Sequence, residues 1–404
     1  MPNARSKLKD ILDADLCVGC GLCEGVTGHT VKMAFNNQGF LRPDAVAANE
    51  GDAASIVQAC PGHKLNLPET SVDTDVIWGP LVKCRTGYAA DEQLRHLGSS
   101  GGGLSALIAS LLETGFANSV THITADVDNP IHNKLIESTD LSSIKAAAGS
   151  RYCPSAPLSS LSEIIQGNSR MVLVGKPCDI AGARQYLEQH PSHKDKIVLL
   201  VSFMCGGLPS IEGTHQILKQ LGMEGKELKS FRFRGEGWPG GVKAEAKDGT
   251  IATMSYDDSW GGILRNYTQY RCKICPDAVG QFADIVFADA WYIDQSGMPS
   301  FDEAHGQSMI LTRTQSGEEA CVSAITAGNV CSEPLDVEMM NKMQPYHVKR
   351  KRLAFTRMLA FKLMGHKVPS CKNLNVRQAA LQAGIWQNIR SVLGTIRRIL
   401  VKKY

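Results

Sequence analysis

Four cysteines near the N-terminus have the residue type and spacing of iron–sulfur ligands. Cys17, Cys20 and Cys23 are separated by two residues each, and Cys60 follows at a distance, directly before a proline. Two-residue gaps let successive thiolates reach corners of one cube, and a remote Cys-Pro commonly supplies the fourth ligand of a 4Fe–4S cluster. Because no further cysteine lies between Cys23 and Cys60, the pattern predicts one cluster here. A zinc site or free structural thiols are the alternatives.

A second group of four cysteines is expected from topology. Cys272 and Cys275 form a C-x-x-C pair, which alone fits a redox dithiol or half of a zinc site equally well. Cys178 and Cys205 each follow a predicted buried strand, at 171–174 and 197–203, and parallel strands deliver both to the carboxyl edge of a sheet. We therefore expect a second iron–sulfur site on these four residues. Cys153 is the main competitor, and the remaining cysteines are expected to be buried small residues or bystanders: Cys84, Cys321, Cys331 and Cys371.

Several glycine-bearing loops are candidates for binding an anionic cofactor. Residues 98–103 are rich in Gly and Ser and lead directly into an apolar helical segment at 104–112, so their amides converge on a helix N-terminus. Each loop alone is also compatible with an ordinary solvated turn. The candidate residues are Ser99, Ser100, Gly101, Gly102, Gly149, Ser150, Tyr152, Lys176, Pro177, Arg232 and Arg234.

One apparent dinucleotide-binding motif is rejected. Residues 235–240 match G-x-G-x-x-G, but they precede a hairpin signal at Asp248-Gly249 and not a helix. The P-loop and zinc-protease motifs are also absent from the sequence.

The pattern of segments predicts an α+β fold. Strand, helix and strand alternate over 171–203, a helix is expected from Pro209 to Leu221, and strand signals recur at 119–127, 242–255 and 283–287. This pattern indicates a sheet that is at least partly parallel. We expect a ferredoxin-like iron–sulfur domain at 1–78, a mixed α/β cofactor-binding core at 79–345, and a basic helical tail at 346–404.

Charge is distributed unevenly along the 404 residues. Residues 1–345 carry 29 Lys or Arg against 40 Asp or Glu, whereas 346–404 carry 14 Lys or Arg and no acidic residue. An acidic body with a basic tail argues against a nucleic-acid binder and indicates one patch for an anionic partner or membrane surface. Apolar residues at helical spacing over 381–399 fit a helix on the inner membrane face, or one packed on the protein's own core or on a second copy in a homo-oligomer. The N-terminus lacks a signal-peptide pattern, so we expect a cytoplasmic protein.

Taken together, these motifs resemble the family of coenzyme F420 hydrogenase/dehydrogenase β subunits, iron–sulfur flavoproteins that include ferredoxin-dependent chlorophyll-pigment reductases. The resemblance covers about residues 12–345 and rests on the two cysteine patterns, on Gly149-Ser150-Arg151-Tyr152, on 175–182 and on 231–238. It implies FAD held by the loops at 99–102, 149–152 and 176–178, and two 4Fe–4S clusters. The tail looks more like that of bacterial members found with polysaccharide biosynthesis.

Our hypothesis from sequence is a FAD-dependent iron–sulfur reductase. Electrons would enter from a ferredoxin-like donor at the N-terminal cluster, pass to the second cluster and FAD, and reduce an organic small molecule. The candidate proton donors are His96, Tyr152 and Asp179. The alternatives are a non-catalytic electron-transfer β subunit of a hydrogenase or dehydrogenase complex, an oxidoreductase of a deazaflavin coenzyme, and a structural zinc protein.

Overall fold

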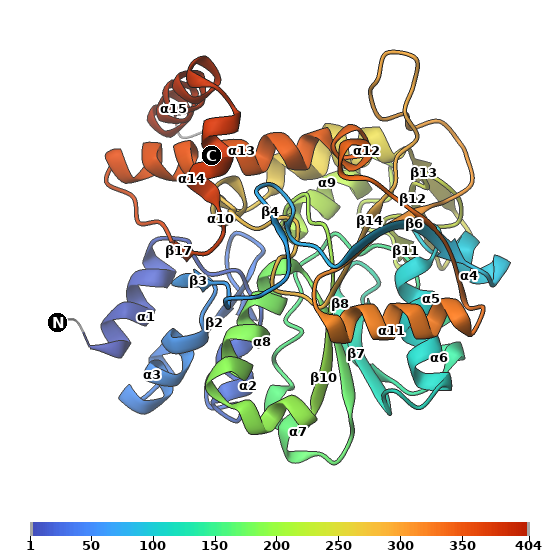
Figure 1. The fold of residues 1–404 in the computed structure, drawn as a ribbon, viewed down its shortest axis with the longest axis horizontal. Coiled ribbons are helices and arrows are strands. Elements are labelled where there is room, and N and C mark those ends of the chain that lie inside the picture. Colours follow the sequence, from blue (N-terminus) through green and yellow to red (C-terminus); the bar gives the residue numbers. More distant parts are fainter. Residues whose placement is uncertain (1–2, 402–404) are drawn as a thin grey trace.

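The computed structural model describes residues 3–401, and its centre is an eight-stranded mixed sheet (Figure 1). The strand order is β16-β6-β15-β14-β10-β9-β7-β8. Strands β7, β9, β10 and β14 are parallel to one another, and the remaining pairs are antiparallel. The strands are β6 (Lys83–Ala89), β7 (Ser119–Ala125), β8 (Asn133–Ser138), β9 (Met171–Gly175), β10 (Ile197–Phe203), β14 (Ile285–Asp289), β15 (Ser308–Thr312) and β16 (Val330–Pro334).

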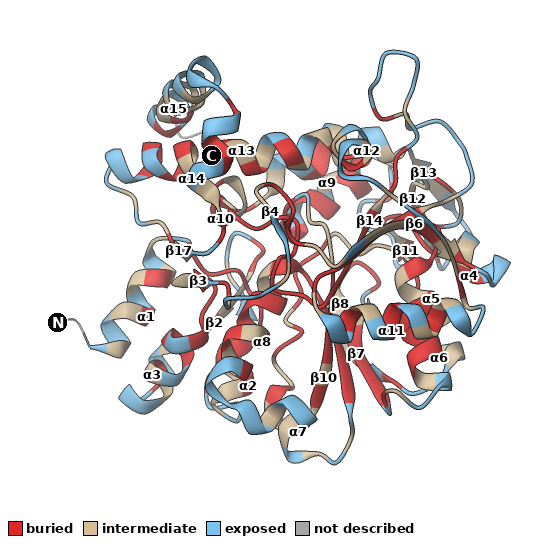
Figure 2. Ribbon diagram, viewed as in Figure 1, coloured by how far each residue is buried: buried red, intermediate tan, exposed pale blue. Residues whose placement is uncertain are grey.

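Helices cover both faces of this sheet, because its central strands are apolar on both sides. Val172 and Val174 of β9 face a cluster that contains α5 (Gly103–Glu113) and α11 (Gln315–Thr326). Leu173, between them, faces the opposite cluster, with α8 (Pro177–Gln189). Figure 2 shows these strands as buried. Further helices of the core are α4 (Glu92–Leu97), α6 (Leu141–Ala146), α7 (Leu161–Gln166), η2 (Pro191–Asp195) and α9 (Ile211–Gln220).

Most elements predicted from periodicity are confirmed. The predicted strands at 171–174 and 197–203 are β9 and β10, and the helix expected at 104–112 is α5. The hairpin around Asp248-Gly249 is present as β12 and β13. The prediction that a helix begins at Pro209 is wrong: Pro209 bridges to Thr268, and α9 begins at Ile211 after Ser210.

A smaller sheet and a helical segment stand beside the main sheet. The smaller sheet has the order β11-β12-β13, all antiparallel. The segment that follows it carries the pair Cys272 and Cys275. The elements are β11 (Leu228–Arg232), β12 (Val242–Ala246), β13 (Ile251–Met254), η3 (Asp257–Ile263), η4 (Leu264–Tyr267) and α10 (Tyr270–Lys273).

The N-terminal segment packs on the core. Gln185 of α8 donates from Nε2 to the Ala59 carbonyl at 3.0 Å and accepts from the Asn66 amide at 2.9 Å. The N-terminal elements are α1 (Ala4–Asp13), α2 (Leu22–Val26), β1 (Met33–Phe35), β2 (Leu41–Pro43), η1 (Ala45–Ala47), α3 (Glu50–Ala59), β3 (Lys64–Asn66), β4 (Thr74–Asp75) and β5 (Gly79–Pro80).

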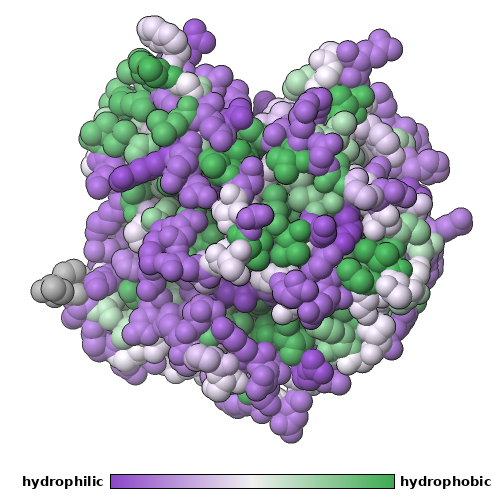
Figure 3. All heavy atoms as spheres, viewed as in Figure 1, coloured by the Kyte–Doolittle hydropathy of each residue, from purple (hydrophilic) through white to green (hydrophobic). Residues whose placement is uncertain are grey.

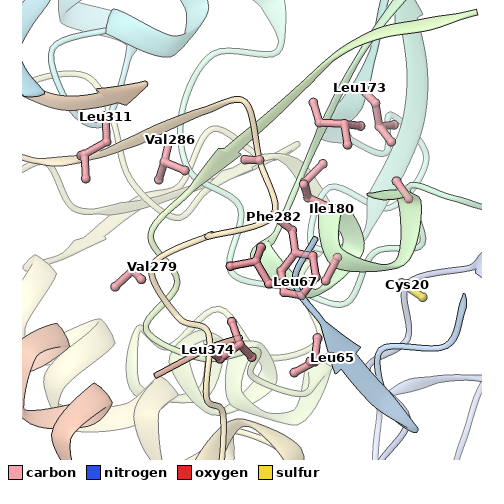
Figure 4. Packing of buried hydrophobic residues seen from close by; sticks show 14 of the residues in the cluster. Cys20, Leu65, Leu67, Leu173, Ile180, Val279, Phe282, Val286, Leu311 and Leu374 are labelled. Carbon is pink, nitrogen blue, oxygen red and sulfur yellow. The ribbon is translucent and has the colours of Figure 1, made fainter. Parts of the chain in front are cut away.

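The C-terminal segment is helical, as predicted, and joins the two preceding parts. β17 (Ser370–Lys372) pairs in parallel with β3 of the N-terminal segment. Figure 4 shows Leu374 in one apolar cluster with Leu65, Ile180 and Phe282, and with Cys20 close by. The tail is therefore part of the folded body. Its helices are α12 (Val337–Met343), α13 (Pro345–Leu363), α14 (Val376–Gln382) and α15 (Ile385–Leu400).

Candidate functional site

Cys17, Cys20, Cys23 and Cys60, here called the N-terminal thiol group, lie within electrostatic range of one another. All four are buried. Burial raises the pKa of Cys23, and negative charge on Cys60 and Cys17 raises it further. Burial likewise raises the pKa of Cys60 to about 11, and charge on Cys17 adds to this effect. Such effects arise between groups within electrostatic range of one another.

The backbone around this group favours sulfur that carries negative charge. Gly19 and Gly21 have positive φ angles, 73° and 85°, which let the chain wrap around the thiols. Amide hydrogen bonds from Gly19 to Cys17 and from Leu22 to Cys20 oppose the effect of burial on these pKa values. Such N–H···S contacts are typical of the surroundings of thiolate ligands.

Cys178, Cys205, Cys272 and Cys275, here called the core thiol group, also lie together. Burial raises the pKa of Cys205 to about 12, and the charges of Cys272 and Cys275 raise it further. Burial raises the pKa of Cys178 in the same way, with contributions from Cys205 and Cys272. The backbone amide of Leu208 donates to Cys272 Sγ at 3.3 Å. The predicted delivery of two cysteines to one sheet edge thus holds.

The other cysteines are placed differently. Cys153, the predicted competitor, is buried in an apolar cluster with Phe231 and Phe233, and burial raises its pKa to about 12. Cys371 of β17 lies near enough to Cys275 for its charge to affect the Cys371 pKa, after the larger effect of burial. Within residues 3–401, no three His, Cys, Asp or Glu side chains form a group that could hold a single metal ion.

Polar side chains connect the two thiol groups. Arg271, which precedes Cys272, is buried and donates from Nη2 to the carbonyl of Pro61, which follows Cys60, at 3.3 Å. Gln269 accepts from Arg42 Nη2 at 3.1 Å and places its Nε2 3.7 Å from Cys272 Sγ. The guanidinium of Arg42 in turn lowers the pKa of Cys17, against the larger effect of burial. Two connections therefore run from one group to the other, and neither was predicted from sequence.

A cavity of about 550 Å³ lies at the carboxyl edge of the main sheet, beside the core thiol group. Cys205 is in its lining. The N-terminus of α5 opens on it, with Gly102 in the left-handed conformation and no side chain capping the helix. The predicted cofactor residues in its lining are Ser99, Ser100, Gly102, Gly149, Ser150, Tyr152, Lys176 and Arg234.

Lys176 and Asp179 form a buried ion pair in the lining of the cavity. Lys176 Nζ lies 2.7 Å from Asp179 Oδ2 and donates to Ser155 Oγ at 3.0 Å. Burial opposes the charge of Lys176, but the Asp179 carboxylate raises its pKa well above the usual value. Asp179 also acts on Cys20, whose pKa is raised first by burial and then by this carboxylate. The carboxylate also raises the pKa of Cys178, after the larger effect of burial, so Asp179 acts on a cysteine of each thiol group.

Arg234 and aromatic rings line another part of the cavity. Arg234 Nη1 donates to Asp289 Oδ2 at 2.9 Å, and its Nη2 lies 2.8 Å from Oδ1. The guanidinium carbon is 4.7 Å from the ring centroid of Tyr256 and 5.1 Å from that of Trp291. Burial raises the pKa of Tyr152, so its phenol stays protonated at neutral pH. This wall can bind a planar ring and donate hydrogen bonds to it.

Four of the residues predicted to bind a cofactor or donate a proton do not line the cavity. His96 is exposed on α4, so its predicted role as a proton donor lacks the required placement. Pro177 is the first residue of α8. Arg232 donates from Nη1 to the Ala148 carbonyl at 3.0 Å and holds the loop of Gly149. Gly101 packs against the backbone of Gly306.

The position of Gly101 gives a test of the loop with a matched control. Gly101 has φ 68°, and an added Cβ would lie 2.4 Å from the Gly306 carbonyl oxygen. Gly115 has φ 70°, but an added Cβ there would meet nothing within 4 Å. We expect G115A to lower the free energy of unfolding by about 1 kcal/mol through backbone strain, and G101A by about 2 kcal/mol more through the clash. Urea unfolding measures both; equal losses would contradict the close packing of this loop.

Residues of the C-terminal segment complete the site, which the sequence did not indicate. Arg350 of α13 donates to the carbonyls of Gly206 and Cys272, at 2.5 and 2.6 Å, and lines the cavity. Lys351 donates to the Pro276 carbonyl at 3.0 Å. His347 also lines the cavity, and its Nδ1 is shielded from solvent with no hydrogen-bond partner among residues 3–401. α13 thus places positive charge beside the core thiol group.

Two models of one family match this chain. The model of the N-terminal part of the coenzyme F420 hydrogenase/dehydrogenase β subunit matches residues 84–163, and the model of its C terminus matches residues 168–338. The chain belongs to this family. The matched ranges include the whole core thiol group, whereas the N-terminal thiol group and α13 to α15 lie outside them. The resemblance identified from sequence is confirmed, and with it an oxidoreductase family.

Relatives of this family member include parts of larger complexes. One subunit of the F420H2 dehydrogenase of Methanosarcina mazei is 23% identical over 78% of this chain and 83% of its own. The β subunit of the coenzyme F420 hydrogenase of Methanothermobacter thermautotrophicus is 24% identical over 73% of this chain and 100% of its own. A chain of the F420-reducing [NiFe] hydrogenase complex of Methanosarcina barkeri has a similar fold, with a TM-score of 0.56 and 20% sequence identity. The superposition covers 74% of this chain and 98% of the hydrogenase chain.

No helix within residues 3–401 has the length and apolar character needed to span a bilayer.

Proposed function

We propose that this chain is an electron-transferring flavoprotein of the β-subunit type. In this proposal it exchanges hydride equivalents with a deazaflavin coenzyme at the cavity, and single electrons with a partner protein through the two thiol groups. The observation that carries the proposal is the placement of Cys205, which belongs to the core thiol group and also lines the cavity. The names of the relatives favour this function over ferredoxin-driven reduction of another organic molecule.

The donor sets fit the cofactors proposed for them. Eight thiols in two groups of four, each facing backbone amides or basic side chains, suit two 4Fe–4S clusters. The open N-terminus of α5, the hydroxyls of Ser99 and Ser100, and the aromatic wall suit the phosphates and ring of FAD. When bound, FAD supplies the exchange between two-electron and one-electron chemistry.

The residues of the chain have distinct tasks in this proposal. The amides of Gly102 and Gly103 bind phosphate, and Ser99 accepts from the Ser150 amide, which joins two of the loops around the cavity. Tyr152 and Arg234 lie where a planar ring would bind, and the protonated phenol of Tyr152 donates a hydrogen bond there. Asp179 accepts from Lys176 Nζ and so positions that lysine at the cavity.

The route between the two thiol groups is short and carries positive charge. Arg271 and Arg42 contact both groups or their flanking residues, and Arg350 and Lys351 stand beside the core group. Cationic side chains stabilise the reduced, more negative state of a cluster and so raise its reduction potential. This arrangement supports passage of electrons between the cavity and a partner at the N-terminal group.

The test begins with protein purified without oxygen and loaded with iron, sulfide and FAD. Reduced deazaflavin coenzyme is mixed with it, and a one-electron acceptor is supplied either as a dye or as a candidate partner protein. We expect the flavin to be reduced by the coenzyme and reoxidised by the acceptor. Reoxidation by organic small molecules after reduction with ferredoxin, without any reaction with deazaflavin, would favour the reductase predicted from sequence. We do not propose a role in polysaccharide synthesis, because the relatives named above are subunits of a dehydrogenase and a hydrogenase.

A further inference from the structure

The last helix, α15, leaves part of its apolar face uncovered. Thr395 and Ile399 are buried, and Thr356 Oγ1 of α13 lies 3.0 Å from Ser391 Oγ, so one side of α15 packs on the protein. Ile399 shares an apolar cluster with Met358 and Phe361 of α13. The prediction that the stripe packs on the protein's own core is thus correct for one side of the helix. A second apolar side remains in contact with solvent.

This second side is here called the α15 strip. Its side chains are 43% to 77% exposed and, at the α-helical period, fall within an arc of about 100°. Figure 3 shows hydrophobic atoms at the surface of the region where α14 and α15 lie in Figure 1. Leu381 of α14 is exposed as well. The strip consists of Ile385, Trp386, Ile389, Leu393 and Leu400.

Basic residues border the strip. At the same helical period, Arg390 and Arg397 fall at one edge of the arc, and both are exposed. Residues 346–401 contain no Asp or Glu, although the preceding 345 residues carry an excess of acidic side chains. The strip and its basic border thus form one surface that attracts anions, on an otherwise acidic protein.

We propose that α15 binds flat on an anionic lipid membrane, with the strip between the acyl chains and the arginines at the headgroups. An amphipathic helix with large apolar residues on one face and arginine beside it lies in the plane of the interface. With 16 residues, α15 is about 24 Å long, enough for several turns to contact lipid. This inference does not depend on the proposed electron transfer. It would place that reaction at a membrane surface.

A second copy of the chain fits this surface less well. Pairing two strips would bring Arg390 and Arg397 of both copies together, and like charges at an interface oppose association. An anionic lipid surface instead complements these charges, and its fluid acyl chains can pack around side chains of different size.

The test uses full-length protein loaded with its cofactors and vesicles of two compositions. One contains phosphatidylcholine alone, and the other contains phosphatidylcholine with phosphatidylglycerol. We expect flotation with the anionic vesicles, reduced by high salt. The variant I385S/W386S/L393S should bind at least about tenfold more weakly, because three apolar side chains no longer enter the lipid. The variant R390Q/R397Q should lose the preference for anionic lipid.

A matched control replaces three exposed apolar residues elsewhere. V46S/V127S/I251S changes side chains that are at least 58% exposed and lie outside α15, and it should bind as the wild type does. Quenching of Trp386 by brominated lipid, with W386F as background, tests the wild type without relying on the folding of a variant. Absence of wild-type flotation, absence of Trp386 quenching, or a concentration-dependent dimer that the triple variant abolishes would overturn the proposal.

Discussion

Replacing Cys205 with serine is expected to lower the iron content from about eight to about four atoms per chain, because each four-thiol group binds four irons in the proposed scheme. Cys205 lines the cavity, so the same change removes the cluster next to the flavin. Reduced deazaflavin coenzyme should still reduce the flavin of C205S, whereas electrons should no longer reach a one-electron acceptor. Iron analysis and stopped-flow absorbance measure these two effects separately.

Two further cysteine variants make this test specific. C60S should also lose about four irons, but from the N-terminal thiol group, so the core cluster should still be reduced. C331S changes a half-buried cysteine of β16 outside both groups and should keep all eight irons. Equal iron contents in C205S and wild type would contradict the assignment of the core thiol group.

Replacing Lys176 with methionine is expected to lower the free energy of unfolding by about 3 kcal/mol, because the charge of Asp179 would remain buried without its partner. The side chains of Lys176 and Asp179 are 8% and 0% exposed. Lys176 lies in the lining of the cavity, so flavin affinity should fall as well. Denaturant unfolding and flavin titration under anaerobic conditions measure the two losses.

The double variant K176M/D179L provides the control for this prediction. Replacing both partners with apolar residues removes the unpaired charge, and such replacements of buried ion pairs are often tolerated. We expect the double variant to be more stable than K176M. If K176M/D179L is the less stable of the two, the ion pair does not explain the role of Lys176.

Local sequence patterns predicted the main elements well, for a physical reason. The buried strands β9 and β10 are continuous apolar runs, and α5 has helical spacing throughout, so these signals need no knowledge of distant residues. The start of α9 was predicted two residues early, because Pro209 takes part in a bridge with Thr268, a contact that a local pattern does not reveal.

The nearness of Cys178 and Cys205 was predictable because the order of the strands fixes where these two cysteines lie. Cys178 and Cys205 follow parallel neighbouring strands, so the rule for ligand placement at the carboxyl edge applied directly. The contributions of α13 were not predictable in this way. Arg350 and Lys351 belong to the basic tail that was predicted to form a patch for an anionic partner or membrane surface, and only the packing of α13 brings them to the core thiol group.

The proton-donor candidates show the same limit. Tyr152 and Asp179 both line the cavity, Asp179 as the ion-pair partner of Lys176, whereas His96 is exposed outside it. Residue type and position along the chain do not specify the direction in which a side chain points.

The most direct test of the account follows electrons from the cavity into the thiol groups. Oxidised protein carrying iron, sulfide and FAD is mixed with reduced deazaflavin coenzyme without oxygen, while flavin absorbance is recorded and samples are frozen for electron paramagnetic resonance. We predict bleaching of the flavin followed by the signals of two reduced 4Fe–4S clusters. Fully loaded protein whose flavin and clusters stay oxidised under these conditions would contradict the account.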